Sequence, residues 1–376
     1  MKRVILICAA ISGLYAATLN VPAEYSTIQA AIDAAVNGDI VLVATGTFTG
    51  EGNVDLDPVG KAITIKSVNG PENTTIDCEN NDRAISFYGE ETWDTVFEGF
   101  KIKQGLKGIG GAIYIEESSP QILNCIIESC SANDGGAIYI DYESNPLIRD
   151  CYIHNNSAND DGGAIYISDS YVQIVNCDIS GNTASNTGGA ISSSDSDLSI
   201  DGSTFITNEA SYGGGFYFDG YSENGIDINN SYIGDSFANF SGQGNGGGMY
   251  LKGYYWEPLL INMDSTTVEA NTSECYGGGI FAQYISDESY WFNLTISSNS
   301  ITSLCEGGGM YLQNSDPRII NSVFEGNIVY STGAAIAVEE DSQVLLERVL
   351  IRDNHAEDGG VISSGLGANI DLLNVA

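Results

Sequence analysis

The chain has 376 residues, with 50 acidic against 13 basic side chains and a formal net charge of −37 at pH 7. It offers no basic face for phosphate groups, which excludes nucleic acid and anionic membrane surfaces as partners. The 43% of hydrophobic residues suffice for a buried core, and the 45 glycines disfavour a helical bundle. The composition is typical of an acidic, β-rich, secreted protein.

The first residues predict a signal peptide over residues 1–16. Lys2 and Arg3 form a positive start, residues 4–10 are apolar, and a small-residue cleavage point precedes Ala17. The apolar run is too short to cross a membrane, and no later run reaches 18 apolar residues. We therefore expect an exported chain without a transmembrane segment, in which seven of the eight cysteines remain after cleavage.

A short helix is predicted near the start of the mature chain. Ser26 can cap it with Gln29 as its capping-box partner, and Gly38 can end it. Residues 24–77 read YSTIQAAIDAAVNGDIVLVATGTF, then KAITIKS and TTIDC, and resemble the first coils of pectin-lyase-like β-helix proteins. The resemblance implies a β-helix whose open end this helix covers, protecting an edge that would otherwise recruit other strands.

From about residue 105 the sequence repeats with a period near 26 residues. Glycine pairs lead apolar runs, as in GGAIYI at 110–115, 135–140 and 162–167, followed by GGGFYF, GGGMYL and GGGIFA. Asparagines mark a second recurring position at Asn156, Asn182, Asn208, Asn271, Asn299, Asn327 and Asn354. The runs are rich in β-branched residues and lack a helical apolar stripe. They predict a solenoid in which equivalent residues stack about 4.8 Å apart.

Each repeated column has a predicted place in the coil. Ile122, Ile148, Ile174, Ile200 and Ile319 fill the interior, and Trp291 occupies the same slot as a core residue. The asparagines are expected at a bend, in the left-handed conformation, with amides bonded along the stack. Glycine pairs serve bends where φ is positive or a Cβ does not fit.

The fold class follows from these columns. We predict an all-β, right-handed, single-stranded parallel β-helix of roughly a dozen coils with a short N-terminal capping helix. Residues 17–105 form the cap and first coils, and residues 106–376 form the repeat region.

Two motifs that recur together carry a family resemblance. Gly188-Gly189-Ala190-Ile191 is a GGAI motif and Phe324-Glu325-Gly326-Asn327 is an F-x-x-N motif, although many coils carry Ile in place of Phe. The combination, over about residues 105–376, resembles the repeat of chlamydial-type polymorphic outer-membrane proteins. That family consists of surface adhesin passengers with β-helical folds, so the resemblance implies a secreted or cell-surface adhesin.

Catalytic constellations known on this fold are not evident in the sequence. Uronate lyases need a calcium carboxylate cluster beside an Arg or Lys, and no cation of the repeats stands next to one. A polygalacturonase-like site needs three aspartates, a nearby His and R-x-K. Residues 159–163, NDDGG, are the one fragment of that kind, and a solvated turn is the favoured interpretation of Asp160-Asp161. His154 and His355 lie outside the partner motif, and R-x-K is absent.

The cysteines are interpreted mainly as buried thiols. Cys125, Cys151 and Cys177 fall in one column, where stacked Cβ vectors aim sulfurs poorly at one another. Cys275 and Cys305 each stand two residues before a glycine triplet, so a stacked disulfide between them is the open alternative.

Acidic residues recur just beyond the glycine-led run. Stacked like charges destabilise unless a cation or water screens them, and calcium accepts carboxylate oxygens in flexible geometry. The candidate calcium ligands are Asp141, Asp169, Asp195 and Asp219. A hydrated acidic face that needs no cation is the alternative interpretation.

Two insertions lengthen the coils between residues 237 and 261. Tyr254, Tyr255 and Trp256 lie in one, and residues 237–245 form the other. Loops from neighbouring coils are expected to lie together on the side of the solenoid, where exposed aromatics suit stacking on sugar rings or a protein anchor. Alternatively, these aromatics fold back over the coil.

The sequence thus predicts an adhesin or glycan-binding module without catalysis, with a polysaccharide lyase or hydrolase as the alternative and a stalk segment as a third. No cofactor is required, apart from the calcium considered above. Asn369, Ile370 and Leu372 fall 26 residues after Gln343, Val344 and Leu346, so another coil begins on schedule. Its open edge leads us to expect either further coils with an anchoring domain, or end-to-end self-association.

Overall fold

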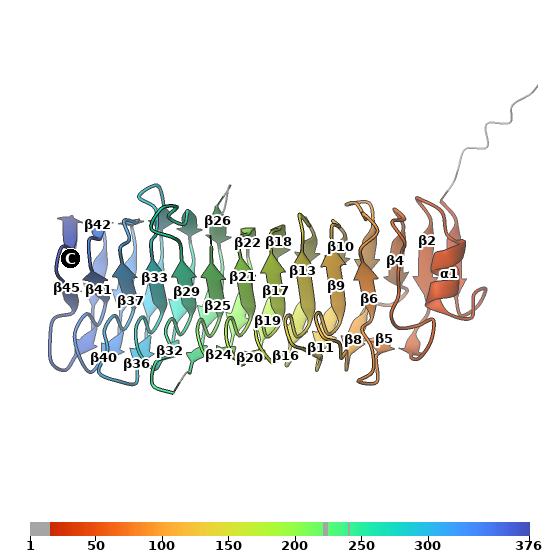
Figure 1. Cartoon of the computed structure of the whole chain (residues 1–376), viewed down its shortest axis with the longest axis horizontal. Coiled ribbons are helices and arrows are strands. Elements are labelled where there is room, and N and C mark those ends of the chain that lie inside the picture. The colour runs from red at the N-terminus through yellow and green to blue at the C-terminus, as the bar shows by residue number, and fades with distance from the viewer. Residues whose placement is uncertain (1–15, 221–224, 240) are drawn as a thin grey trace, which may run out of the picture.

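The structure is a computed structural model that describes residues 16–220, 225–239 and 241–376. The predicted signal peptide, apart from Ala16, lies outside these residues. Four parallel sheets run along a single solenoid, and from β10 onward the chain crosses them in the order sheet 1, sheet 2, sheet 3 and sheet 4 (Figure 1). The 14 strands of sheet 1 correspond to about 14 turns, slightly more than the predicted dozen.

Sheets 1 and 2 follow each other around a sharp bend. Sheet 1 contains β1 (Thr18–Val21), β2 (Ile40–Val43), β4 (Thr64–Ser67), β7 (Val96–Glu98), β10 (Gln121–Leu123), β14 (Leu147–Arg149), β18 (Tyr171–Val175), β22 (Asp197–Asp201), β26 (Ile226–Asn229), β30 (Ile261–Asp264), β34 (Tyr290–Phe292), β38 (Arg318–Ile320), β42 (Gln343–Glu347) and β46 (Asn369–Leu373). Sheet 2 contains β3 (Gly46–Phe48), β5 (Thr74–Asp77), β8 (Lys101–Lys103), β11 (Ile126–Glu128), β15 (Tyr152–His154), β19 (Asp178–Ser180), β23 (Thr204–Ile206), β27 (Tyr232–Gly234), β31 (Thr267–Glu269), β35 (Thr295–Ser297), β39 (Val323–Glu325) and β43 (Leu350–Arg352).

Sheets 3 and 4 complete the coil. Sheet 3 has two-residue strands: β12 (Ser131–Ala132), β16 (Ser157–Ala158), β20 (Thr183–Ala184), β24 (Glu209–Ala210), β28 (Phe237–Ala238), β32 (Thr272–Ser273), β36 (Ser300–Ile301), β40 (Ile328–Val329) and β44 (His355–Ala356). Sheet 4 holds the glycine-led strands β6 (Ile85–Phe87), β9 (Ile113–Glu116), β13 (Ile138–Asp141), β17 (Ile165–Ser168), β21 (Ile191–Ser194), β25 (Phe216–Asp219), β29 (Met249–Lys252), β33 (Ile280–Gln283), β37 (Met310–Gln313), β41 (Ile336–Glu339) and β45 (Ile362–Ser364).

The interior is an aliphatic stack, as predicted. Ile122 pairs with Ile148, Ile148 with Ile174 and Ile174 with Ile200, and all four are fully buried. Trp291 continues the same column between Met263 and Ile319 with no exposed surface, and its Nε1–H donates to the Ile261 carbonyl at 3.1 Å. The core-residue interpretation of this tryptophan is confirmed.

The asparagine column forms a buried hydrogen-bonded ladder. The Asn182 N–H donates to Asn208 Oδ1 at 2.9 Å, and its Nδ2 donates to the Ile153 carbonyl at 3.0 Å. The stacked amides are as predicted, but the left-handed residue is the one before the ladder, such as Asn155 with φ 55° or Thr207 with φ 56°. The asparagine itself points inward, because its side chain replaces missing backbone partners at the bend between sheets 2 and 3.

The two glycines of each pair have different structural roles. Gly135 has φ 62°, a conformation that L side chains rarely adopt. A Cβ on Gly136 would lie 2.2 Å from the Gly163 carbonyl oxygen of the next coil. The first glycine therefore turns the chain, and the second lets two coils approach closely.

Helix α1 (Ile28–Ala34) caps one end of the solenoid, beside β1 and β2 (Figure 1). Its N-cap is Thr27, whose hydroxyl accepts the Ala30 N–H, so the prediction of Ser26 was wrong by one residue. Gln29 bonds to Asp33 and to the Asp57 backbone, and therefore fixes the helix to the next coil. Ile28, Ala31 and Ile32 are buried over the first strands.

The predicted division at residues 105–106 is not a break in the solenoid. β8 lies before it, β11 lies beyond it, and the two strands pair in register. Sheet 3 does begin only after this point, so the first coils have a different cross-section from the later ones. At the other end, Gln343 pairs with Asn369 and Leu346 with Leu372, which confirms the predicted register of the last coil.

The cysteines divide as the sequence allowed. Cys125, Cys151 and Cys177 are buried free thiols, and the Cys125 N–H points at Cys151 Sγ at 3.4 Å. Cys275 and Cys305 form a disulfide between consecutive coils, with their Cα atoms 5.1 Å apart. No helix in the described part of the chain is long and apolar enough to cross a membrane.

Candidate functional site

Three surface grooves lie along one corner of the solenoid. This acidic corner is defined as the turns that lead from sheet 4 to sheet 1. The central groove has about 930 Å³, the N-terminal groove, lined by Glu90, Glu117, Tyr142 and Glu143, about 430 Å³, and the aromatic groove about 330 Å³. The described residues that line them include no Lys, Arg or His.

The floor of the corner is a ladder of buried serines. The Ser118 N–H donates to Ser144 Oγ at 3.2 Å, Ser144 N–H to Ser170 Oγ at 3.3 Å, and Ser170 N–H to Ser196 Oγ at 3.1 Å. Serine is small enough for the sharp turn. Its hydroxyl accepts the backbone N–H of the previous coil, which has no carbonyl partner among the described residues at this turn. The ladder therefore fixes the positions of the side chains on either side of it.

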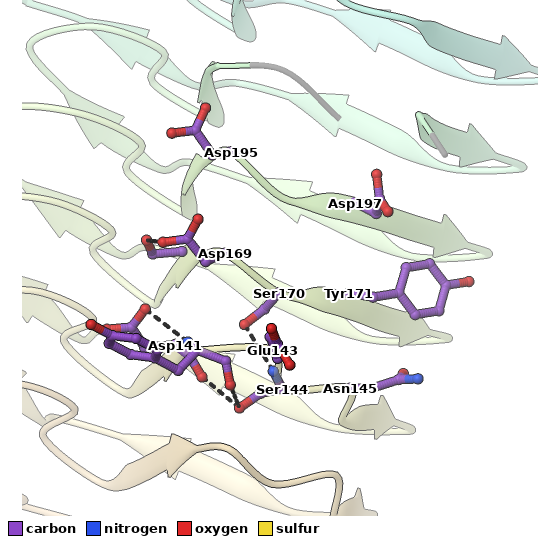
Figure 2. Close-up of a pocket in the computed structure, with 11 residues that line it drawn as sticks. Asp141, Glu143, Ser144, Asn145, Asp169, Ser170, Tyr171, Asp195 and Asp197 are labelled. Atoms are coloured by element: carbon purple, nitrogen blue, oxygen red, sulfur yellow. Dashed lines mark hydrogen bonds between the residues drawn. The ribbon is translucent and has the colours of Figure 1, made fainter. Parts of the chain in front are cut away.

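Two rows of side chains border the central groove (Figure 2). Asp141, Asp169 and Asp195 come from three successive coils on one side, and Asn145, Tyr171 and Asp197 lie on the other, across the serines. Burial raises the pKa of Asp141, while the Tyr142 N–H and the Tyr139 hydroxyl donate to its carboxylate. The groove therefore concentrates negative charge.

The four predicted calcium ligands do not form one column. Ser168 pairs with Ser194 and Ser194 with Asp219, so Asp219 shares its register with Ser168 and not with Asp169. Asp219 lies on the sheet, where its Oδ2 accepts from Lys252 Nζ at 3.0 Å and from the Tyr217 hydroxyl at 3.0 Å. A cation partner is thus already present at Asp219.

The aromatic insertion forms a tight turn at the acidic corner. Tyr254 and Glu257 exchange two backbone hydrogen bonds of 3.1 Å, which leaves Tyr255 and Trp256 at the tip. Both stems are tied to the next coil, because the Gly253 N–H donates to the Gln283 carbonyl and the Leu259 N–H to the Tyr284 carbonyl, each at 2.9 Å. A Cβ on Gly253 would lie 2.4 Å from the Tyr284 oxygen, so this stem requires glycine.

The aromatic side chains at the tip point into solvent. Tyr255 and Trp256 are each 79% exposed, which contradicts the alternative in which they fold back over the coil. Tyr254 stacks on Trp256 with 5.4 Å between ring centroids, and Tyr255 meets Tyr284 edge-on at 6.3 Å. We call these three residues the aromatic turn; it follows β29, whose place along the solenoid is labelled in Figure 1.

The aromatic groove opens beside this turn. It is lined by Tyr255, Pro258, Tyr284, Ile285, Ser286, Asp287, Asn314, Asp316 and Asp341. Asp316 Oδ1 accepts the Gln343 N–H at 2.6 Å, which fixes its carboxylate, and burial raises the pKa of Asp316. The second insertion does not join this site, because residues 239 and 241–245 precede β29 and lie at its opposite end.

A second acidic cluster lies at the other end of the sheet 4 strands, where the sequence favoured a solvated turn. Carboxylate oxygens of Asp134, Asp160 and Asp161 lie within 4.8 Å of one another. Asp161 Oδ1 accepts from Thr187 Oγ1 at 2.5 Å and from Asn186 Nδ2 at 3.0 Å. Burial raises the pKa of both Asp134 and Asp161. Among the described residues this is the group close enough to share one cation.

The sequence contained a signal for this cluster. Asp134 and Asp161 each stand directly before a glycine pair, so they are one coil apart in the same column. The histidines lie elsewhere: His154 is on sheet 2 beside Glu128, at 3.2 Å, and His355 is in sheet 3.

Comparisons with known proteins agree with the fold. Residues 83–255 match the family model described as the right handed beta helix region. The catalytic domain of Agl-KA has a TM-score of 0.50 at 16% identity, covering 94% of this chain and 68% of that one. PfbA, a surface adhesin of Streptococcus pneumoniae, has a TM-score of 0.47 at 14% identity, covering 91% of this chain and 88% of that one. Polygalacturonase from Erwinia carotovora ssp. carotovora has a TM-score of 0.43 at 10% identity, covering 94% of this chain and 96% of that one.

No curated protein matches the chain. The match to the Agl-KA catalytic domain, at 16% identity, shows a shared fold and does not transfer an activity. The protein is a right-handed parallel β-helix protein.

Proposed function

We propose that this protein is an extracellular adhesin-type module that binds glycans, with the aromatic turn as its anchor. One observation carries the proposal: two large aromatic side chains are 79% exposed on a rigid turn beside an open groove. An isolated exposed aromatic needs no explanation, but two at one tip form an apolar patch that water solvates poorly. Aromatic faces of this kind suit the apolar faces of sugar rings.

The turn is organised before a ligand arrives. Its stems are hydrogen-bonded to the next coil, and Lys252 Nζ lies 5.8 Å from the Tyr254 ring centroid while it pairs with Asp219. Because the turn is already ordered, binding does not lose the conformational entropy that ordering a flexible loop would cost. The predicted signal peptide and the acidic composition support an extracellular location.

Replacement of Tyr255 and Trp256 by Ala tests this proposal. We expect binding on a glycan array to be lost, while unfolding free energy changes by less than about 0.5 kcal/mol because both side chains are in solvent. Tyr152→Ala with Tyr330→Ala is the matched control, since these exposed tyrosines lie away from the acidic corner. Retained binding in the Tyr255/Trp256 variant would contradict the proposal.

A polysaccharide hydrolase is the second candidate function, favoured by the Asp134, Asp160 and Asp161 cluster. Two carboxyl groups with raised pKa beside an exposed carboxylate can supply a proton donor and a base. Release of reducing ends from neutral and acidic polysaccharides, abolished by Asp161→Asn, would establish it. Growth of absorbance from unsaturated ends would instead indicate a lyase.

A further inference from the structure

The aromatic groove differs from a general sugar site in its charge. Three of its lining residues are the carboxylates Asp287, Asp316 and Asp341, and none of its described lining residues is a cation. Arg318 follows Asp316 by two residues, but its guanidinium lies 5.2 Å from the Tyr290 ring centroid and its Nη1 contacts the Tyr290 hydroxyl at 3.2 Å. The walls of the groove therefore carry negative charge beside an apolar platform.

We infer that this groove takes glycans whose sugars carry protonated amino groups. The inference rests on the proposed function, since the aromatic turn supplies the stacking surface. It adds the class of ligand: the carboxylates attract an ammonium group and repel uronate or sulfate groups.

Stacking on the sugar ring and attraction of its amino group are assigned to different residues of the groove. Asp316 is held by the Gln343 N–H at 2.6 Å, so one carboxylate has a fixed position in the groove, while Asp287 and Asp341 are exposed on its walls. Tyr255 reaches Tyr284 across the mouth of the same groove. A sugar stacked on the turn is thus within the groove that holds the carboxylates, and its amino group replaces solvent next to them.

The net charge of the whole molecule adds to the preference of the groove for cationic over anionic glycans. At −37 the whole molecule repels polyanions before contact, and the field is strongest in a concave site of a single sign. Polyuronates are therefore the class of glycan that this groove excludes.

The test is calorimetric titration at about pH 6, where amines are protonated, with three oligosaccharides of equal length. Glucosamine oligomers, their N-acetylated counterparts and oligogalacturonate supply positive, neutral and negative ligands. We expect the glucosamine oligomer to bind about tenfold more tightly than the acetylated one, oligogalacturonate to show no binding, and the preference to fall at about 0.5 M salt.

Two variants separate the inference from the function on which it rests. Asp287→Asn, Asp316→Asn and Asp341→Asn together should remove the preference for the amine but keep stacking. Asp141→Asn, Asp169→Asn and Asp195→Asn in the central groove change the charge equally and should leave the preference intact. Loss of all binding in Tyr255→Ala with Trp256→Ala would support both statements.

Other outcomes overturn the inference in distinct ways. Equal binding of both glucosamine forms would leave a glycan-binding protein without this selectivity. Binding of a lysine-containing peptide as tight as that of the glucosamine oligomer would show that charge alone is recognised. Absence of binding by every saccharide would remove the proposed function together with the inference.

Discussion

At the scale of single residues, the fold depends on buried asparagines whose amides are hydrogen-bonded to neighbouring coils. Asn299 accepts two hydrogen bonds from Asn271 in the coil before it, and its Nδ2 donates to the Val268 carbonyl of that coil. A buried amide costs free energy unless it is paired, so each asparagine depends on partners in the neighbouring coil. Ser236 interrupts the ladder between Asn208 and Asn271, where its N–H still donates to Asn271 Oδ1 at 3.0 Å.

We expect Asn299→Ala to lower the unfolding free energy by about 3 kcal/mol or more. The substitution leaves the Asn271 N–H and the Val268 carbonyl buried without partners, at about 1–3 kcal/mol each. Denaturant unfolding followed by circular dichroism measures the change. The adjacent Ser298→Ala is the control, since Ser298 is exposed, and equal losses in the two variants would contradict this account.

Thr207→Gly should stabilise the protein by about 1 kcal/mol. Thr207 is exposed, β-branched and left-handed at φ 56°, whereas Gly181 and Gly326 occupy its position in other coils. Thr204→Gly in β23 should destabilise by a similar amount, because strand geometry gains nothing from glycine. Thermal melts of the two variants should therefore shift in opposite directions.

At the scale of elements, the turns decide where chemistry can occur. Strands of sheet 4 carry glycines at one end and acidic turns at the other, and the candidate site residues lie at these two ends. The aromatic turn extends from β29 because Gly253 and Leu259 fix its stems to the next coil. Insertions at this corner can vary without disturbing the core, as is usual for loops on a rigid scaffold.

The disulfide between Cys275 and Cys305 should contribute about 3 kcal/mol, because it closes a 30-residue loop in the unfolded chain. Cys275→Ser with Cys305→Ser should lower the unfolding free energy by that amount. Dithiothreitol should act equally on the parent protein and leave the variant unchanged, since the other described cysteines are free thiols. A reductant effect on the variant would contradict this assignment.

Calcium binding stays a prediction. We expect millimolar calcium to raise the melting temperature more than sodium at equal ionic strength, because only a ligand of the folded state stabilises by mass action. Asp169→Asn with Asp195→Asn should remove the gain if the central groove is responsible. Asp160→Asn should remove it if the ion is held by the cluster with Asp134 and Asp161 instead.

At the scale of the whole molecule, negative charge is the dominant long-range property. The charge of −37 is spread over a solenoid whose coils interact mainly with their neighbours, and carboxylates line the three grooves of the acidic corner. Buried carboxyl groups therefore titrate in a strongly negative field.

Stability should rise as the pH is lowered through the folded-state pKa values of four partly buried aspartates and on toward 3.8, their ordinary pKa. Burial raises the pKa of Asp134, Asp141, Asp161 and Asp316 in the folded state. A group with a raised folded pKa gives its full stabilisation below its unfolded pKa and loses it as the pH rises through the folded pKa.

Below about pH 4 the trend should reverse. Hydrogen bonds from backbone N–H groups lower the pKa of Asp39 and Glu24, and their contribution is lost on protonation. Melting temperatures across this range, with Asp134→Asn as a variant of shallower slope, measure the effect. A melting temperature that falls steadily as the pH is lowered from 7 to about 4 would contradict the prediction.

Column chemistry could be predicted from sequence wherever every coil has the same length. The stacking of Ile174 on Ile200, the bond between Asn182 and Asn208 and the last-coil register all follow from one 26-residue step. The prediction that the four aspartates form one column was wrong. Asp141 and Asp219 come six residues after the first glycine of their coil, whereas Asp169 and Asp195 come seven after it. A shift of one residue along a strand moves a side chain to the other face or into the turn.

The sequence by itself determined the repeat, the core columns and the acidic charge, because stacked identical coils force equal residues into contact. Only the tertiary structure decided that Tyr255 and Trp256 face solvent, that the two insertions lie at opposite ends of β29, and that Asp134 meets Asp160 and Asp161. Those outcomes depend on the direction in which each turn leaves its strand, and that direction is set by hydrogen bonds to the neighbouring coil.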